Sequence, residues 1–168
     1  MPVDDTTFRR TLGNFATGVT VMTTRDPATG KPVGVTVNAF SSVSLDPPLV
    51  LFCLGLRSEL LDIFKANGHY AVNVLAQDQE DLSGRFSRRG DDKFAEVRTS
   101  DGAGGVPVID GCVASLECQL SDVLDGGDHA ILVGRVLDAH YHPETVPLLY
   151  FRGGYMDAAA ALAKESRE

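Results

Sequence analysis

The chain has 168 residues, 43% of them hydrophobic and 23% charged, with a formal net charge of -8 at pH 7. This length and composition favour one soluble globular domain over residues 1–168 and argue against wholesale disorder. The acidic balance argues against nucleic-acid binding, because a negative surface repels phosphate backbones, and any anionic ligand would need a local cluster of positive charge.

The N-terminal region predicts a short helix and then a β-hairpin. Phe8, Leu12 and Phe15 are spaced i, i+4 and i+7 and therefore share one helical face. Gly18 is expected to end this helix. The β-branched run and the turn residues after it predict the hairpin, with a strand at residues 19–24, a turn at 26–31 and a strand beginning at Pro32 or Val33.

The segment 33–54 combines strand-like runs with small polar side chains. Residues 49–54 form a continuous apolar run after the break at Asp46-Pro47-Pro48, which predicts a strand buried on both faces. Between the apolar runs lie hydroxyl and amide side chains, at Thr36, Asn38, Ser41, Ser42 and Ser44. They offer hydrogen bonds without charge or a strong base, which suits a neutral, planar, polar ligand.

A second helix is predicted after this segment. Ser58 fits its N-cap and Gly68 its C-terminal end, and the apolar stripe between them consists of Leu60, Leu61, Ile63 and Phe64. The elements predicted next are a strand at 70–75, a short helix at 79–86, a polar loop at 87–93 and an exposed, mobile, Gly-rich loop at 101–107.

The C-terminal part predicts a long β-hairpin. Residues 113–124 alternate between apolar and polar side chains, as in a half-buried antiparallel strand. The inward set is Ala114, Leu116, Cys118 and Leu120, and the outward set is Ser115, Glu117, Gln119 and Ser121. The remaining elements are a tight turn at 125–128, strands at 129–140 and 148–151, a turn at 153–155 and an Ala-rich helix at 156–164.

These elements predict the fold class. About seven strands are joined mostly by turns rather than by regular helical crossovers. The expected fold is therefore mainly β, an antiparallel barrel with a few short peripheral helices, and not a doubly wound parallel sheet.

The sequence also indicates the compartment. Three cysteines, Cys53, Cys112 and Cys118, show no Cys-x-x-Cys spacing, which favours free buried thiols in a reducing environment. Residues 1–5 lack the basic and apolar regions of a signal peptide. No apolar run approaches the roughly 20 residues of a membrane span. We expect a cytoplasmic protein that does not bind membranes.

Hydrolytic and metal chemistry finds little support. There is no Gly-x-Ser-x-Gly elbow, no His-Glu-x-x-His, no P-loop and no Rossmann fingerprint. His140 and His142 would share a strand face, but no Cys or acidic ligand accompanies them at a recognisable spacing, so we expect no metal site.

Positive charge is locally concentrated in this acidic chain. Arg57 precedes Ser58 at a predicted helix N-terminus, which is a ready anion site, and a basic cluster follows at Arg85, Arg88, Arg89 and Lys93. Both features could equally be solvated surface. Beside the polar segment, they make a flavin phosphate a reasonable ligand.

His129 is either a hairpin-end residue or a functional one, and Tyr155 could stack on a base or pack against the terminal helix.

Several segments together resemble the short-chain flavin reductases, the reductase components of two-component flavin-dependent monooxygenases. The matching segments are 15–21 (FATGVTV), 36–50 (TVNAFSSVSLDPPLV), 70–75 (YAVNVL), 127–129 (GDH) and 149–155 (LYFRGGY). The resemblance implies a split β-barrel that binds FMN or FAD, with homodimer formation the usual state. Its match covers nearly the whole chain, from about residue 8 to 155, in the order and spacing of the family.

The resemblance also implies a role for individual residues. The flavin ring and ribityl chain would lie along Thr36, Val37, Asn38 and Ser42, with Ser41 and Val43 nearby and the backbone of Cys53 and Leu54 on the far side. Arg57 and Ser58 would hold the phosphate, and Phe86 with the basic loop would close over the rest of the nucleotide. His129 would contact NADH or NADPH, and Tyr155 would help cover that pocket. Val37 departs from the family, where many members have alanine, so the fit beside the ring differs.

The implied activity is an NAD(P)H:flavin oxidoreductase that supplies free reduced flavin to a partner monooxygenase. Hydride transfer between two stacked cofactors needs alignment and little water rather than a protein nucleophile, so no catalytic side chain is expected. Two alternatives are a flavin-binding carrier or sensor without reductase activity, and an oxidase like the related pyridoxamine-phosphate oxidase barrels. The oxidase lacks a clear second anion pocket for a phosphorylated substrate.

Overall fold

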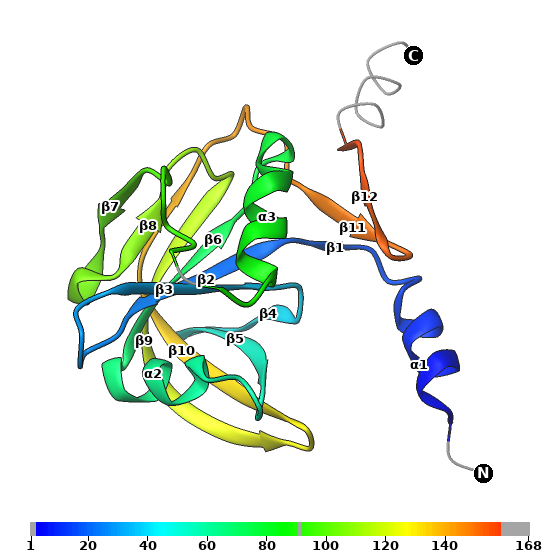
Figure 1. Cartoon of the computed structure of the whole chain (residues 1–168), viewed down its shortest axis with the longest axis horizontal. Coiled ribbons are helices and arrows are strands. Elements are labelled where there is room, and N and C mark those ends of the chain that lie inside the picture. The colour runs from blue at the N-terminus through cyan, green and yellow to red at the C-terminus, as the bar shows by residue number, and fades with distance from the viewer. Residues whose placement is uncertain (1–2, 91, 159–168) are drawn as a thin grey trace.

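The structure, a computed structural model, describes residues 3–90 and 92–158. This part of the chain is mainly β, with a seven-stranded antiparallel sheet, a three-stranded sheet, a two-stranded sheet and three short α-helices. Figure 1 shows α2 and α3 beside the large sheet, whereas α1 and the β11–β12 arm project away from it. The predicted mainly β, antiparallel fold with short peripheral helices is confirmed.

The elements have the following bounds. The strands are β1 (Thr17–Gly18), β2 (Thr20–Arg25), β3 (Pro32–Val37), β4 (Phe40–Leu45), β5 (Pro48–Gly55), β6 (His69–Val74), β7 (Thr99–Asp101), β8 (Pro107–Ile109), β9 (Ala114–Gly126), β10 (His129–Tyr141), β11 (Leu149–Phe151) and β12 (Gly154–Met156). The helices are α1 (Asp5–Leu12), α2 (Leu60–Asn67) and α3 (Glu80–Ser87), and 3-10 turns lie at Gln77–Gln79 and Ala103–Gly105.

The strand order shows why the large sheet closes on itself. The order is β3-β2-β6-β9-β10-β5-β4, so β3 and β4 are its two edges. Only Asn38 and Ala39 separate these strands in the chain, and two residues span at most about 7 Å. The two edges must therefore come together at this junction, which makes the sheet a barrel rather than an open layer.

The core consists of two clusters of buried side chains. In the first, the Phe52, Phe64 and Tyr70 rings meet edge to face, with centroids 5.1 to 6.2 Å apart. In the second, Phe86 of α3 packs edge-on against Phe94 at 5.0 Å. A Cβ at Gly34 of β3 would lie 2.9 Å from the Phe86 ring, so glycine lets α3 sit close on β3.

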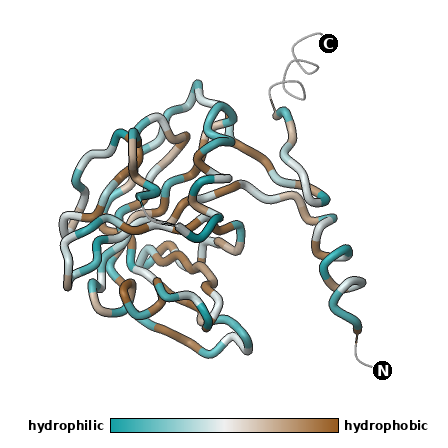
Figure 2. The backbone as a smooth tube through the Cα atoms, viewed as in Figure 1, coloured by the Kyte–Doolittle hydropathy of each residue, from teal (hydrophilic) through white to brown (hydrophobic). Residues whose placement is uncertain are grey.

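The N-terminal helix differs from its prediction. It ends at Leu12, where Gly13 forms the C-cap, rather than at Gly18. The predicted apolar face is also exposed, since Phe8 and Leu12 are 55% and Phe15 is 76% exposed. Asp4 caps the helix by accepting from the Thr7 N–H. The hydrogen bond from the Thr7 hydroxyl, and then the one from its N–H, lower the pKa of Asp4. Figure 2 shows apolar segments in this projecting part as well as in the sheet.

Two strand predictions also need correction. Residues 49–54 form a strand, but β5 buries alternate residues, Val50, Phe52 and Leu54, and the other face is half-buried. On β9, Ser115 is buried although the alternation placed it outside. Irregular register with β10 disturbs the period of the strand.

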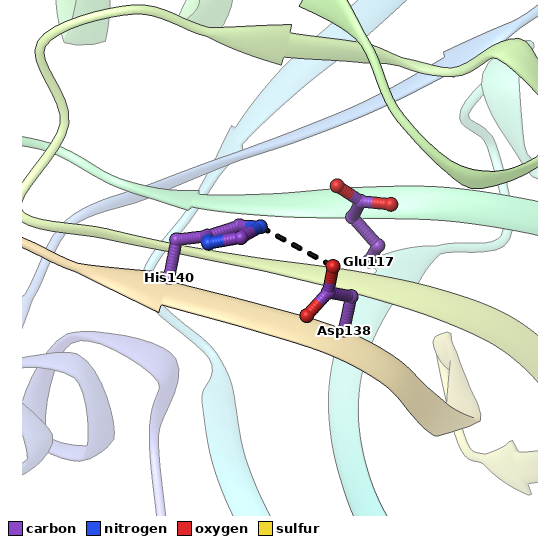
Figure 3. A group of neighbouring side chains, drawn as sticks. All are labelled: Glu117, Asp138 and His140. Atoms are coloured by element: carbon purple, nitrogen blue, oxygen red, sulfur yellow. Dashed lines mark ion pairs between the residues drawn. The ribbon is translucent and has the colours of Figure 1, made fainter.

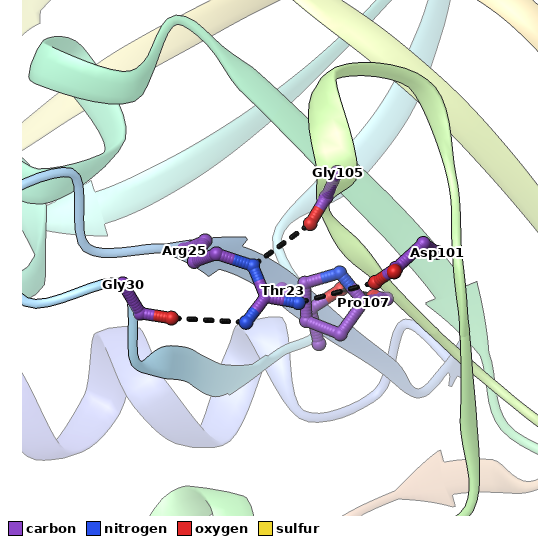
Figure 4. A network of polar contacts seen from close by, with 6 residues as sticks. All are labelled: Thr23, Arg25, Gly30, Asp101, Gly105 and Pro107. Carbon is purple, nitrogen blue, oxygen red and sulfur yellow. Dashed lines mark hydrogen bonds and ion pairs between the residues drawn. The ribbon is translucent and has the colours of Figure 1, made fainter.

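The Gly-rich segment 101–107 was predicted to be exposed and mobile. The predicted exposure is wrong for the last two residues of the segment. Val106 and Pro107 are buried. Figure 4 shows how Arg25 and Thr23 hold the segment to β2. Arg25 Nε donates to Gly105 O at 2.9 Å, and the Thr23 hydroxyl donates to Pro107 O. Side chains of β2 thus satisfy the backbone carbonyls of Gly105 and Pro107. The sequence pattern alone could not identify these partners.

The later strands and α3 lie close to their predicted ranges, whereas the C-terminal segment differs. The strands at 70–75, 129–140 and 148–151 and the helix at 79–86 are confirmed, with shifts of one or two residues. The segment 153–155 enters a strand, β12, that was not expected. Most of the helix predicted at 156–164 lies outside the described residues, and Met156 belongs to β12. None of the helices in the described part of the chain combines the length and apolar character that crossing a bilayer requires.

Candidate functional site

Of two cavities that predicted site residues line, the larger lies between β3, the start of α2 and the segment after α3. Its volume is about 1050 Å³, which is at the upper end for small-molecule sites, roughly 300–1,000 Å³. The lining includes three predicted site residues, Arg57, Ser58 and Phe86. The other lining residues are Lys31, Pro32, Val33, Gly34, Val35, Glu59, Leu60, Ser87, Arg88, Arg89, Gly90, Asp92, Lys93 and Phe94.

The α2 end of this cavity is built for an anion. The helix starts at Leu60, so its N-cap is Glu59 and not Ser58 as predicted. The Ser58 hydroxyl nevertheless accepts from the Leu60 N–H at 3.3 Å. It therefore faces the helix N-terminus, where Arg57 adds an exposed guanidinium. Hydroxyl, guanidinium and helix dipole all favour a phosphate or carboxylate here.

The basic cluster divides into anchored and open residues. Arg85 donates to the Ala95 carbonyl, and Lys93 Nζ donates to Gly34 O at 3.3 Å and Phe86 O at 3.1 Å. Burial lowers the pKa of Lys93. These two side chains fasten the loop to β3 and α3. Arg88 and Arg89 are exposed and line both cavities, so they are the charges available to a ligand.

Tyr155 lies at the smaller cavity, of about 670 Å³, which adjoins the basic loop. Its hydroxyl is 2.7 Å from the Ser83 hydroxyl, and its ring meets Tyr150 edge-on at 5.5 Å. The residue is 39% exposed, so one part of the ring stays open to a ligand. The rest of the lining consists of Glu80, Asp81, Gly84, Arg85, Arg88, Arg89, Gly90, Asp92, Lys93, Ala95 and Glu96.

The predicted ring-binding residues gather where β3, β4 and β5 meet. The Cys53 N–H donates to Ala39 O at 3.0 Å, which joins β5 to the β3–β4 junction. Asn38, Ser41, Ser42 and Val43 are exposed there, whereas Val37 and Leu54 are buried, with 7% and 5% of their surface exposed. Thr36 commits its hydroxyl hydrogen to Ser83 O at 2.7 Å. These residues lie outside the described lining of both cavities.

His129 opens β10 directly opposite Gly55 of β5. Its Nδ1 is 2.7 Å from Asp128 Oδ1, and this hydrogen bond is the main reason why the pKa of Asp128 lies below its ordinary value. The Leu56 N–H donates to Asp128 O at 3.0 Å. The β9–β10 turn is therefore fastened beside Arg57, which also lowers the pKa of Asp128 slightly.

Sequence reasoning missed Ser83 and Asp128 as partners of site residues. Ser83 stands three positions before Phe86 and so shares its buried helical face, and Asp128 directly precedes His129. Both positions can be read from the sequence. The hydrogen bonds of Ser83 to Tyr155 and of Asp128 to His129 cannot, because they depend on how the chain folds.

His140 has neighbours that the sequence did not reveal. Figure 3 shows it beside Asp138 on β10 and Glu117 on β9, with ligand-type atoms within 4.8 Å of one another. A register shift in β10 places Asp138 opposite Glu117. His140 Nε2 already pairs with Asp138 at 3.3 Å, and Glu117 accepts from the Ala103 N–H at 2.6 Å. Each of the three side chains thus has a polar partner within the protein.

The arrangement can hold a phosphorylated, planar ligand. The described lining of both cavities contains no histidine or cysteine, and burial raises the pKa of the half-buried Cys53 thiol. Arg57 and Ser58 can hold a phosphate, and the exposed groups of the β3–β4 junction can hydrogen-bond a neutral ring. The residues present therefore fit a flavin nucleotide.

The chain is similar to known flavin reductases. The family model described as "Flavin reductase like domain" matches residues 12–159. A Rhizobium meliloti protein named "Probable flavin reductase" is 44% identical over 152 residues, which cover 90% of this chain and 48% of that protein. The chain thus spans about half the length of that relative.

Two further relatives match over most of their length. The reductase subunit HsaB of a flavin-dependent monooxygenase from Rhodococcus jostii is 42% identical over 153 residues, covering 91% of this chain and 77% of that protein. The NADH:FAD oxidoreductase SgcE6 of Streptomyces globisporus, solved with NAD and FAD fragments, superposes with a TM-score of 0.86 at 38% identity, covering 92% of each chain. The predicted flavin-reductase split barrel is confirmed.

Proposed function

The chain belongs to the flavin reductase-like domain family, and we propose that it is an NAD(P)H:flavin oxidoreductase that reduces FMN or FAD and releases the reduced flavin to a partner monooxygenase. The observation that carries the proposal is the anion end formed by Arg57 and Ser58, which lies at a cavity of about 1050 Å³ that Arg88 and Arg89 also line. The relatives named as NADH-dependent reductases favour NADH over NADPH.

Each part of the site has one task in this proposal. Arg57 and Ser58 hold the flavin phosphate, and the β3–β4 junction (Thr36, Val37, Asn38, Ser41, Ser42, Val43) with Cys53 and Leu54 borders the ring. His129 and Tyr155 contact the nicotinamide nucleotide, and Phe86 supports the basic loop beside it. Hydride passes from the nicotinamide to the flavin, and the protein contributes alignment and exclusion of water.

Weak flavin binding suits a reductase that hands its product to another enzyme. Asn38, Ser41 and Ser42 are exposed and uncharged, so they offer hydrogen bonds that water can replace. The reductase subunit of a monooxygenase among the relatives supports a partner of that class. The free thiols of Cys53, Cys112 and Cys118 suit a cytoplasmic setting.

A homodimer is part of the proposal. The projecting segment exposes three large apolar side chains, Phe8 and Leu12 on α1 and Phe15 after it. Large apolar side chains exposed on one segment favour an interface with another chain. Light scattering coupled to size-exclusion chromatography would give twice the chain mass of 17.9 kDa for the dimer.

The test is a titration of NADH and NADPH oxidation against added FMN and FAD. A reductase oxidises the nicotinamide nucleotide at a rate that saturates with flavin. A flavin carrier or sensor, the second candidate, would retain flavin through dialysis and leave NADH unconsumed. Such a result would overturn the reductase proposal in favour of the carrier.

A further inference from the structure

Ser83 is a polar residue that the proposed mechanism does not use, yet it is almost completely buried. Its exposure is 2%, and it lies on the face of α3 that packs toward β3. A buried hydroxyl must find a partner, since leaving it unpaired costs about 1–3 kcal/mol. The hydroxyl and the backbone carbonyl of Ser83 both have partners, and each partner is a predicted site residue.

The Ser83 carbonyl receives the hydroxyl hydrogen of Thr36 at 2.7 Å. A helical carbonyl accepts one bond from the N–H four residues on and has a second lone pair for such a contact. The hydroxyl of Thr36 therefore has no hydrogen left to donate, and it can only accept from a ligand.

The Ser83 hydroxyl makes the second contact, with the Tyr155 hydroxyl at 2.7 Å. These residues are 72 positions apart in the chain. Tyr155 belongs to the projecting arm, whereas Ser83 belongs to the body of the protein (Figure 1). The bond thus ties the arm to α3 at the cavity that Tyr155 lines together with Arg88 and Arg89.

We propose that Ser83 is a positioning residue for the nicotinamide nucleotide: its hydroxyl holds Tyr155 against the bound nucleotide, while its carbonyl fixes Thr36 at the flavin. The inference rests on the proposed reductase function. The hydroxyl and the carbonyl of Ser83 can be tested separately. Ser83→Ala removes the hydroxyl but keeps the backbone carbonyl and its hydrogen bond from Thr36.

The experiment compares Ser83→Ala, Tyr155→Phe and the double variant in the full chain. Each single variant should raise the KM for NADH about 2- to 10-fold, the loss expected for one hydrogen bond. The double variant should match the single variants, because both remove the same bond. The KM for flavin and kcat should change less than about twofold.

Matched controls are Ser121→Ala and Tyr141→Phe. Ser121 donates to Val133 O on an exposed part of β9, and Tyr141 is 76% exposed on β10. Both should leave the two KM values unchanged. If Ser83→Ala folds poorly, Tyr155→Phe removes the same bond from the other side.

Three results would overturn the inference: additive effects in the double variant, equal increases in both KM values, or an unchanged KM for NADH. All three require a wild-type protein that oxidises NADH in the presence of flavin. A wild type that fails to do so contradicts the proposed function itself, so the two failures are distinguishable.

Discussion

The imidazole Nδ1 of His129 lies 2.7 Å from Oδ1 of Asp128, at the turn that joins β9 to β10. A carboxylate beside Nδ1 favours the tautomer with hydrogen on that nitrogen, which leaves Nε2 as an acceptor. In the proposed reductase, Nε2 can then accept from the carboxamide of the nicotinamide. Asp128 thus sets which hydrogen bond His129 offers.

Substitutions of this pair should affect NADH rather than flavin. His129→Ala and Asp128→Ala should raise the KM for NADH about 3- to 10-fold, and Asp128→Asn should stay near wild type because its amide oxygen still accepts from Nδ1–H. Steady-state kinetics with each substrate varied measures this. Asp122→Ala, an exposed carboxylate on β9, is the control. Equal changes in the NADH and flavin KM values would mean a structural role instead.

The pH dependence of the pair follows from the lowered pKa of Asp128. Its ordinary value is 3.8, and the bond with His129 shifts it down in the folded protein. An acid whose pKa is lower in the folded than in the unfolded protein stabilises the fold at pH values above its unfolded pKa. This stabilisation is lost as the pH falls through the pKa of the folded state. Asp128 should therefore contribute no inflection to the NADH KM between pH 5 and 9. An inflection in that range that is lost in Asp128→Asn but persists in His129→Ala would show that Asp128 itself titrates there, and the assignment would be wrong.

Arg57 should discriminate between flavins with and without a phosphate. Arg57→Ala should weaken FMN binding about tenfold through loss of a charge-assisted hydrogen bond, and should leave riboflavin binding unchanged. Fluorescence titration of both flavins measures the two dissociation constants. Arg135→Ala, an exposed arginine on β10, is the matched control. Equal weakening of FMN and riboflavin would place the phosphate elsewhere.

Gly134 should not tolerate a side chain. A Cβ there would lie 2.1 Å from the Tyr70 hydroxyl, and that ring is held edge-on by Phe52 and Phe64. Gly134→Ala should destabilise the fold by about 1–3 kcal/mol, the usual cost of overpacking. Urea unfolding gives the free energy. Gly18→Ala, whose Cβ meets no described atom within 4 Å, is the control, and equal stability of the two variants would contradict the packing.

The cysteines should resist alkylation in the native protein. Burial raises the pKa of Cys112 and Cys118 to about 12, and it raises the pKa of Cys53 as well. A raised pKa keeps each thiol protonated at pH 8, where the thiolate is the reactive species. Mass spectrometry after iodoacetamide treatment should find little modification until denaturant is added. Complete native modification of Cys112 or Cys118 would refute their burial.

Much of the fold could be predicted from sequence because local patterns carry it. The alternation in 113–124 and the turn residues at 26–31 and 125–128 predict hairpins that the structure contains. The pattern at Phe8, Leu12 and Phe15 predicts a helical face but does not say what covers it, and no described residue buries it. Polar β4 was missed because its serines lack the usual strand propensity.

The candidate site was predictable where one local feature suffices. Arg57 and Ser58 adjoin a helix start, so their anion-binding character shows in the sequence. Ser83 and Asp128 carry no such signal. Their importance comes from bonds to Tyr155 and His129, and hydrogen-bond geometry at 2.7 Å is decided by the packing of α3 and the β9–β10 turn.

The most direct test of the account is anaerobic stopped-flow mixing of the protein and FMN or FAD with excess NADH. Flavin absorbance should bleach rapidly in the presence of the protein, at a rate that saturates with NADH, and NADH should be consumed in equal amount. Bleaching no faster than in a mixture without protein, with either NADH or NADPH, would contradict it.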